Sequence, residues 1–420
     1  DQEDTLDENG KKFWSQKNEE LAGDGLRVIA VATKKAKSTD INPYEDLSLI
    51  GLIGMMDPPR TDVKEAIRLC KDAGLRVVMV TGDQAQTALK IASDLGLISE
   101  EESEKIVHGS QIRSVDEMSG AERDKFLEAS VFARVSPEQK LDLIDVHQRA
   151  GSVVAMTGDG VNDAPGLRKA NIGVAMGLRG TQVAKEASDM VLKDDSFATI
   201  VKAIEQGRII FNNIRKFIVY LLSGNASQIM IVFIATLFNA PLPILPLQIL
   251  LLNIINDVFP ALALGLSESS SDVMKYPPRD PDEPILTRMH WFAVFGYGLL
   301  IAVTVLFAFG LSLWWLDMDT KEAVTVSFLT LAFARLWHIF NMRDRSTGVF
   351  KNEIVKNKYV WMALGLCTLI LLSVVYFPVI STVLKITQPD LKSWGMIIVF
   401  SMIPLISGQL YKSINLRSEK

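Results

Sequence analysis

The chain has 420 residues, of which 48% are apolar and 22% are charged, and its formal net charge is −5. This length predicts two to three structural units, and the slightly acidic balance gives no case for nucleic-acid binding. The charges are segregated: Asp257 is the only charged side chain from Phe217 to Ser267, whereas the first half is dense in Lys, Glu and Asp, which excludes a purely cytosolic protein.

The beginning of the chain differs from the rest. Gly25 to Ala32 predicts one strand of a unit whose remainder is missing, and Ala36–Asp46 reads as a polar linker. The chain starts with Asp1 and shows no signal peptide, so we expect that it is not a complete translation product. Its two cysteines, Cys70 and Cys367, lie in different halves, which excludes a disulfide framework and favours a reducing compartment.

Residues 37–199 read as an α/β domain. β-rich runs alternate with helical stretches such as Val63–Ala73 and Gln84–Leu95, and this alternation predicts a parallel, doubly wound sheet with its functional loops at the carboxyl ends of the strands. The β-rich runs are Leu47–Met56, Arg76–Val80, Val131–Val135, Val153–Met156 and Ile172–Met176.

The most informative loop is Thr157-Gly158-Asp159-Gly160-Val161-Asn162-Asp163-Ala164-Pro165, directly after one of these runs. Glycines allow the backbone to approach a ligand closely. Asp159 and Asp163 can direct hard oxygen ligands at one point across a tight turn, which suits Mg²⁺ beside a phosphate. The alternative interpretation is a turn that the two Asp side chains stabilise.

Two further loops carry groups that suit a phosphate. Thr81-Gly82-Asp83 follows a predicted strand and offers a hydroxyl donor, although turns of this composition are common. Farther along, Ser136 is expected to cap a helix, with Pro137 at its first position and Gln139 as the capping-box partner. Lys140 then falls in the first turn, where the helix dipole disfavours a cation, so an anion held between them would explain its place. The alternative is a solvated surface lysine.

Six apolar segments are long enough to cross a bilayer, which takes about 20 helical residues. We place them near 215–238, 245–266, 291–316, 323–341, 359–384 and 394–411, and we expect a stalk helix, Ile200–Lys216, before the first. The connections 267–290 and 342–358 and the tail 412–420 hold eleven Lys and Arg residues against three in the alternate connections. This asymmetry predicts that the first half and the tail are cytoplasmic.

Asp257 lies midway along the second apolar segment, and a carboxylate in hydrocarbon costs ~2.5–3.5 kcal/mol or more, which makes it a functional candidate. Asn253 lies on the same helical face, and Pro260 denies an amide to the carbonyl of Asn256, so we expect free backbone oxygens there. These groups predict a site for a hard cation, with Asn225 and Gln228 from the first segment as further candidates. For Asp257 and for the amides, the alternative is hydrogen bonding between helices.

With these loops and segments, the chain resembles the C-terminal half of a P-type cation-transporting ATPase, closest to calcium pumps. The resemblance covers essentially all residues and rests on the loops above together with the motifs Asp57-Pro58-Pro59-Arg60, Ile172-Gly173-Val174-Ala175-Met176-Gly177 and Pro277-Pro278-Arg279-Asp280-Pro281. It implies an incomplete haloacid dehalogenase-like (Rossmann-like) α/β phosphorylation domain at 37–199 and an all-α bundle of six transmembrane helices within 200–420. Residues 1–36 would be the end of a nucleotide-binding domain, and Asp57–Arg60 the hinge to it.

The resemblance also implies roles for individual residues, with Mg²⁺ as cofactor and ATP as substrate. Asp159 would bind Mg²⁺, with Asn162 and Asp163 completing the phosphate pocket and Asp163 next to the metal. The phosphoryl oxygens would be held by the Thr81-Gly82 turn and Lys140. The nucleotide would be contacted by Arg27, Asp83 and Arg134.

The sequence also departs from the family pattern at positions with functional roles. The family's nucleophile is the Asp of an Asp-Lys-Thr-Gly-Thr motif, and this run does not occur in the sequence, so the chain alone is expected to be inactive. Calcium pumps that move two ions carry acids at the positions of Gln228 and Arg335. We therefore expect one Ca²⁺ per cycle, with Arg335 as a built-in counter-charge. The alternative for Arg335 is a side chain that reaches toward the cytoplasmic basic loop.

The leading hypothesis is a part of an ATP-driven pump that exports a cation, with Ca²⁺ ahead of Na⁺, Mn²⁺ or H⁺. Its expected partners are the cation, ATP, the lipid bilayer and the N-terminal remainder of the pump, with no nucleic acid, and it is expected to be an integral protein of the plasma membrane or an endomembrane. The first alternative is a non-catalytic membrane protein that uses the phosphotransferase-like domain to bind Mg²⁺ or nucleotide. A phosphatase fused to a membrane anchor is less favoured, because an anchor needs no Asp257.

Overall fold

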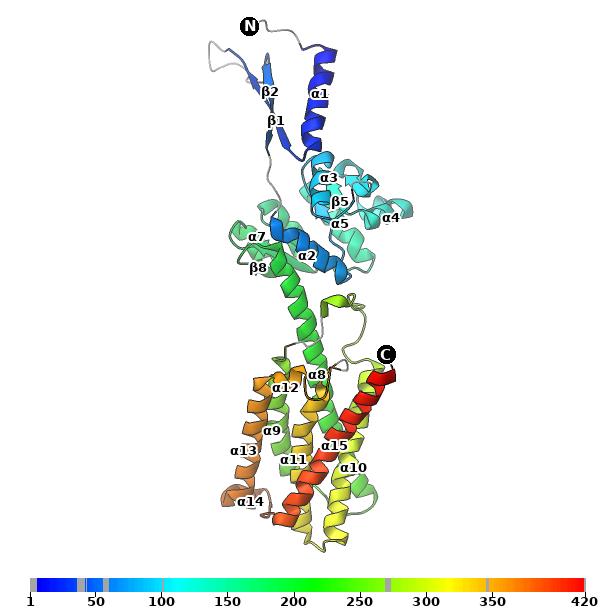
Figure 1. The fold of residues 1–420 in the computed structure, drawn as a ribbon, viewed down its shortest axis with the longest axis vertical. Coiled ribbons are helices and arrows are strands. Elements are labelled where there is room, and N and C mark those ends of the chain that lie inside the picture. Colours follow the sequence, from blue (N-terminus) through cyan, green and yellow to red (C-terminus); the bar gives the residue numbers. More distant parts are fainter. Residues whose placement is uncertain are drawn as a thin grey trace. The chain divides into compact units, whose positions relative to one another are not determined.

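The computed structural model describes residues 6–35, 42, 44–55, 60–99, 102–268, 273–344 and 347–418. Two compact units divide the chain: Asp1–Ile204 with Met274–Pro281, and Glu205–Val273 with Asp282–Lys420 (Figure 1). The expected hinge residues Asp57-Pro58-Pro59 and most of the expected linker lie outside the described residues.

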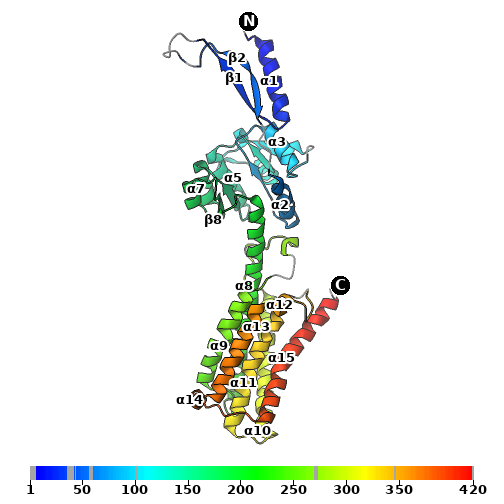
Figure 2. The same ribbon diagram turned by 60° about the vertical axis from the view of Figure 1, so that its left-hand side comes forward.

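The first unit begins with α1 (Glu8–Gly23), which the Asp7 carboxylate caps by accepting from the Gly10 amide at 2.7 Å. β1 (Arg27–Thr33) matches the predicted strand and pairs antiparallel with β2 (Ser48–Met55), as Figure 2 shows. The expectation that Leu47–Met56 joins the parallel sheet is therefore wrong. A continuous apolar run fits either pairing, because its pattern carries no strand direction.

The rest of this unit alternates strands and helices, as predicted. The strands are β3 (Met79–Val80), β4 (Ile106–His108), β5 (Val131–Ala133), β6 (Ala155–Gly158), β7 (Ile172–Met176) and β8 (Met190–Leu192). The helices are α2 (Thr61–Asp72), α3 (Ala85–Asp94), α4 (Gly120–Glu128), α5 (Pro137–Arg149), α6 (Ala164–Lys169) and α7 (Gln182–Ala187). Short 3-10 turns span Ser103–Lys105, Gly109–Gln111, Val115–Glu117 and Val161–Asp163.

The strands form two three-stranded parallel sheets rather than the single sheet that we predicted. Their orders are β3-β5-β4 and β6-β7-β8, so β3 and β6 are edge strands among the described residues. Along β6 and the residues before it, Val153 is 60% exposed and Thr157 is also exposed. Central strands of a doubly wound sheet are covered on both faces. The exposed residues show that β6 is less covered than a central strand of a doubly wound sheet.

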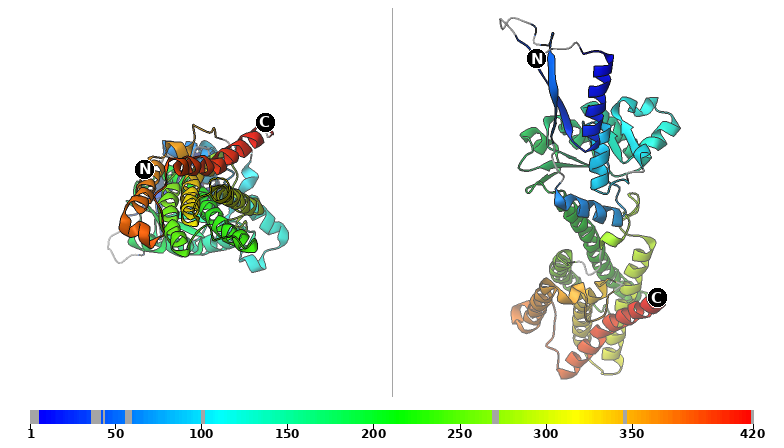
Figure 3. Two further views of the ribbon diagram at one scale, coloured as in Figure 1. Left: turned by 90° about the horizontal axis from the view of Figure 1, so that it is seen from below. Right: turned by 45° about the horizontal axis from the view of Figure 1, so that its top comes forward.

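The second unit is a helical bundle, seen along its helices in Figure 3. The structure contains six described helices that are long and apolar enough to cross a bilayer. They are α8 (Phe197–Leu237), whose first turns belong to the first unit, α9 (Pro246–Gly265), α10 (Arg288–Trp314), α11 (Thr320–His338), α13 (Lys358–Tyr376) and α15 (Leu391–Ser418). Shorter elements are α12 (Glu353–Lys356), α14 (Pro378–Val383) and 3-10 turns at Val273–Lys275 and Ile339–Met342.

α11 is the central helix of the bundle. It contacts α9, α10, α13 and α15, and nearly all of its residues are buried, whereas the other five helices each expose one side. The fifth predicted span is shorter than expected, because α13 ends at Tyr376 and α14 begins at Pro378. Phe377 between them is extended, since proline disfavours helical backbone in the residue before it.

Candidate functional site

Backbone hydrogen bonds join two of the three predicted phosphate loops. The Val135 amide donates to the Thr81 carbonyl at 3.1 Å, and the Arg134 amide donates to the Asp83 carbonyl at 3.1 Å. Within its own loop, the Thr81 hydroxyl donates to Asp83 Oδ2 at 2.7 Å. Arg134 adopts a left-handed backbone (φ 55°), which turns the chain from β5 toward α5. The turn after β3 is therefore hydrogen-bonded to the residues that lead into α5.

The start of α5 has the predicted capping box. The Gln139 amide donates to Ser136 Oγ at 3.3 Å, Gln139 Oε1 accepts from the Ser136 amide at 2.9 Å, and Pro137 occupies the first turn. Lys140, fixed by this cap, places its Nζ 2.6 Å from Asp163 Oδ1. The lysine is therefore partly buried and ion-paired rather than a solvated surface side chain.

Asp163 binds the turn that carries Asp159. Its Oδ2 accepts from the amides of Gly160 at 3.1 Å and Asp159 at 3.3 Å. Burial alone would raise the pKa of Asp163, but the hydrogen bond from Lys140 and the one from the Gly160 amide outweigh it and lower the pKa below its usual value. A Cβ on Gly158 would lie 2.5 Å from the Asp163 Cβ, so this glycine makes room for the carboxylate.

Asp159 differs from Asp163 in having a free carboxylate. Its carbonyl accepts from the Thr181 amide at 2.8 Å, while its exposed side chain makes no hydrogen bond within the described part of the chain. The donor set fits Mg²⁺, because an unpartnered carboxylate lies four residues from an ionised one on the same turn. No cluster of three or more Asp, Glu, His or Cys side chains that could hold a metal occurs among the described residues. Further ligands would therefore have to come from a phosphate or from another segment.

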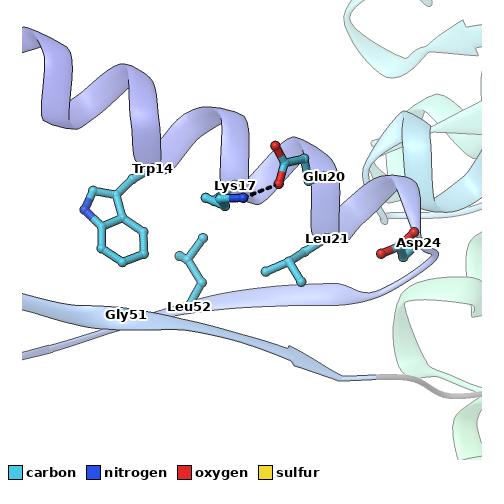
Figure 4. A pocket seen from close by; sticks show the side chains of 7 residues that line it. All are labelled: Trp14, Lys17, Glu20, Leu21, Asp24, Gly51 and Leu52. Atoms are coloured by element: carbon cyan, nitrogen blue, oxygen red, sulfur yellow. Dashed lines mark hydrogen bonds and ion pairs between the residues drawn. The ribbon is translucent and has the colours of Figure 1, made fainter.

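The structure does not bring all predicted nucleotide-binding residues to these loops. Asn162 is exposed on the turn between Asp159 and Asp163, and Arg134 is exposed beside α5. Arg27 is the first residue of β1 in the antiparallel hairpin, which is separate from the two parallel sheets. A hollow of about 420 Å³ lies between α1 and β2 (Figure 4), and no predicted site residue lines it. Its lining is Trp14, Lys17, Glu20, Leu21, Asp24, Gly51 and Leu52.

We expect the lowered pKa of Asp163 to appear in the acid stability of the first unit. A carboxylate with a depressed folded-state pKa contributes stability above its unfolded pKa of about 4, and this contribution is lost as the pH falls through the folded value. Asp163→Asn should remove that loss, so urea unfolding followed by circular dichroism should depend less on pH below about 4. The control is Asp159→Asn, which removes a carboxylate without hydrogen bonds. Equal pH dependence in both variants would contradict the assignment.

In the bundle, three helices bring a second group of predicted residues together. Arg335 of α11 forms an ion pair with Asp257 of α9, and its Nη1 donates to Asn253 Oδ1 at 3.3 Å. Gln228 of α8 donates to the same Asn253 oxygen at 3.0 Å. The Arg335 side chain is 1% exposed, so it points into the bundle and not toward the basic loop.

The two remaining amides present unsatisfied acceptors. Asn225 Oδ1 and Asn256 Oδ1 are buried and have no hydrogen-bond partner among the described residues. A buried carbonyl oxygen without a donor is costly, which makes both oxygens candidates for a ligand. The backbone carbonyl of Asn256 is not free, however: it accepts from Tyr220 Oη at 3.2 Å, so the expectation of an available oxygen there is wrong in this conformation.

Sequence reasoning missed Tyr220 and Gly224 at this site. Tyr220 is buried on α8 and takes up the carbonyl that Pro260 leaves without a donor. Gly224 lies against the Arg335 guanidinium, since a Cβ there would be 2.5 Å from Arg335 Nε. A glycine inside a strongly helical apolar run was the available signal, because glycine is a poor helix former.

Comparison with known proteins gives two family models, which match different parts of the chain. Residues 4–171 match the haloacid dehalogenase-like hydrolases, and residues 241–414 match the C-terminus of cation transporting ATPases. The first range holds Lys140, Asp159 and Asp163, and the second holds Asp257 and Arg335. The Lys140–Asp163 loops and the Asp257–Arg335 pair thus fall inside matched regions, whereas Asn225 and Gln228 lie before the second of them.

Individual relatives are similar over most of the chain. A calcium-transporting ATPase of Bacillus subtilis is 42% identical over 398 residues, calcium-transporting ATPase 1 of Bacillus cereus is 38% identical over 410, and calcium-transporting ATPase 1 of Yarrowia lipolytica is 40% identical over 385. These matches cover 93%, 93% and 91% of the chain but only 44%, 46% and 41% of the relatives. The chain spans about half the length of the curated relatives that it matches, and its sequence corresponds to the C-terminal half of P-type cation-transporting ATPases.

Proposed function

We propose that this chain is the C-terminal part of an ATP-driven pump that exports one Ca²⁺ per cycle from the cytoplasm through an aspartyl-phosphate intermediate. The Asp257–Arg335 pair is the observation that carries the proposal. A carboxylate and a guanidinium in an apolar bundle are costly to desolvate, and replacing such a pair by apolar residues is often neutral or stabilising. The Asp257–Arg335 pair is therefore not explained by fold stability alone, whereas a role in binding a transported cation would explain it.

Arg335 and a cation would compete for the same oxygens. The guanidinium bonds to Asp257 and to Asn253 Oδ1, which are the two acceptors expected to bind the ion. A divalent ion at Asp257 would displace the guanidinium, and Arg335 would return to the carboxylate after release. The unsatisfied oxygens of Asn225 and Asn256 would supply neutral ligands, as hard cations prefer. One fixed positive charge beside one acid supports a single transported Ca²⁺.

The first unit supports phosphoryl transfer. Lys140 is positioned by the α5 cap, next to an ionised Asp163, where it can hold a phosphoryl oxygen together with the Thr81 hydroxyl and the Gly82 turn. Mg²⁺ held at Asp159 would neutralise part of the phosphate charge when bound. The nucleophilic carboxylate would come from the N-terminal remainder, on a strand that pairs with the open edges of β3 and β6. Asp83, Arg134 and Arg27 would contact ATP, together with that remainder.

Two separate observations support the identity of the transported ion and the direction of transport. Relatives at about 40% identity are named calcium-transporting ATPases, which favours Ca²⁺. The Lys and Arg residues of the connections and tail favour a cytoplasmic position for the first unit, so ATP would be used from that side. Coupling requires that both sites bias the same pair of conformations. α8, which is continuous from Phe197 to Leu237, is the candidate element.

The test is cation-stimulated ATP hydrolysis by the full-length polypeptide reconstituted in vesicles. Ca²⁺ should stimulate hydrolysis by the wild type, and Asp257→Asn should abolish that stimulation. The double variant Asp257→Asn with Arg335→Gln leaves no charge unpaired, so its inactivity would separate loss of the ion site from loss of the fold. Ca²⁺ activation that survives in both variants would remove Asp257 from the transport site.

Metal dependence of phosphorylation provides an independent check of the first unit. Asp159→Asn should raise the Mg²⁺ concentration needed for phosphoenzyme formation by about ten-fold or more, because a charged oxygen ligand becomes an amide. Phosphoenzyme labelling at graded Mg²⁺ measures this shift. Asp94→Asn on α3, whose carboxylate pairs with exposed Lys90, is the matched control and should leave the Mg²⁺ requirement unchanged. An unaltered requirement in Asp159→Asn would reject the Mg²⁺ assignment.

A further inference from the structure

Gly224 lies inside a bundle helix, where a small residue lets a neighbouring group approach the backbone. It lies inside α8, a helix of 41 residues, one position before Asn225. Glycine in a helix interior is less favourable than alanine by about 1 kcal/mol, so a glycine here calls for a local reason. Its backbone is helical and needs no positive φ. The reason must therefore be space rather than backbone conformation.

The space at Gly224 is filled by Arg335. A Cβ at this position would lie 2.5 Å from Nε, 2.7 Å from Nη2 and 2.8 Å from Cζ of the Arg335 side chain. Such approaches are shorter than van der Waals contact, so the guanidinium at the end of the Arg335 side chain would have to shift if residue 224 carried a Cβ. The bare backbone of α8 thus forms the surface against which the guanidinium lies.

The guanidinium has little freedom to move away. It is 1% exposed, Nη2 is bound to Asp257, and Nη1 donates to Asn253 at 3.3 Å. Gln228, one turn along α8 from Gly224, also donates to the Asn253 oxygen. A methyl group at 224 would therefore push the guanidinium off the atoms that it bonds.

We propose that Gly224 is a positioning residue for cation transport: it admits the Arg335 guanidinium to the place where it pairs with Asp257, and so allows protein charge rather than a second cation to occupy that part of the pathway. This inference deepens the proposed function and rests on it. Gly224 touches no cation in this scheme. Gly224 acts through Arg335. A substitution at Gly224 should therefore no longer change Ca²⁺ activation once residue 335 lacks a guanidinium group.

The test combines Gly224→Ala with Arg335→Lys in the full-length polypeptide. Lysine keeps the positive charge but lacks the planar Nη1–Nη2 fork, so its flexible end can turn away from a methyl at 224 and still reach Asp257. Gly224→Ala should change the Ca²⁺ concentration for half-maximal ATP hydrolysis by about five-fold or more when residue 335 is Arg, and by less than about two-fold when it is Lys. A change of equal size in both backgrounds would overturn the proposal.

Gly408→Ala is the matched control. A Cβ at Gly408 of α15 would lie 2.6 Å from Asn341 Nδ2, so this substitution crowds the same bundle to a similar degree without touching Arg335. Whatever Gly408→Ala does to Ca²⁺ activation should be the same in the wild-type background and in the Arg335→Lys background. Rescue of Gly408→Ala by Arg335→Lys would show general relief of crowding and would also overturn the proposal.

A second measurement separates failure of this inference from failure of the proposed function. In the 420-residue chain itself, denaturant unfolding in detergent should show coupling between positions 224 and 335: Gly224→Ala should destabilise the Arg335 form and not the Arg335→Lys form. If wild-type hydrolysis is not stimulated by Ca²⁺, the proposed function fails, and the Ca²⁺ role of Gly224 falls with it. If stimulation is present and coupling is absent, only the inference about Gly224 fails.

Discussion

Asp257→Asn should lower the free energy of unfolding of the helical unit by about 3–5 kcal/mol, the range for removing one partner of a buried ion pair. The substitution leaves the Arg335 guanidinium 1% exposed and without its carboxylate, and arginine cannot lose its charge in a protein. Arg335→Gln should cost less, because the carboxyl group left behind can take up a proton. We therefore also predict that Asp257→Asn lowers the free energy of unfolding more than Arg335→Gln does.

Denaturant unfolding in detergent, followed by tryptophan fluorescence, measures this effect. Six of the seven tryptophans lie in the helical unit, and only Trp14 lies outside it, so the signal reports mainly on the bundle. The double variant Asp257→Asn with Arg335→Gln should recover most of the loss. Arg68→Gln, which breaks exposed ion pairs on α2, is the matched control and should leave the bundle unchanged. Equal stability of the wild type and both single variants would mean that the pair is not formed.

Lys140→Met should slow phosphoenzyme formation by about 100- to 1000-fold, the usual effect of removing one charge-stabilising donor from a reacting oxyanion. The reason is geometric: the capping box fixes the start of α5, and among the described residues Lys140 is the cation paired with Asp163. Rapid-quench labelling with radioactive ATP on the full-length polypeptide gives the rate.

The control for this variant is Lys169→Met in the same unit. Lys169 lies 3.4 Å from Asp145 at the end of α6 and is outside the phosphate loops. Its loss should leave the phosphorylation rate within about two-fold of the wild type. A Lys140 variant that labels as fast as the Lys169 variant would exclude Lys140 from phosphoryl transfer and leave it as a structural partner of Asp163.

Local signals in the sequence predicted the elements well. Ser136, Pro137 and Gln139 predict the cap of α5, because capping depends only on residues within one helical turn. The β7 strand and the six apolar helices follow from equally local patterns. The break at Pro378 also has a local signal, since proline restricts the residue before it, whereas the continuous apolar length of 359–384 favours a single span.

The features that sequence reasoning could not supply depend on residues far apart in the chain. The pairing of β2 with β1 and the division of the parallel strands into two sheets are set by tertiary partners rather than by local propensity. At the bundle site, Tyr220 takes the oxygen that Pro260 frees, and Gly224 makes room for Arg335. Both relations join different helices, so no spacing along one helix reveals them.

The unpaired edges of β3 and β6 make the described part of the chain a receptor for an added strand. Edge strands present unused backbone donors and acceptors, which pair readily with an extended segment of another polypeptide. A separately produced partner that carries the Asp-Lys-Thr-Gly-Thr sequence on a strand should therefore dock there in trans. If such docking restores phosphorylation, the two polypeptides would form a split reporter.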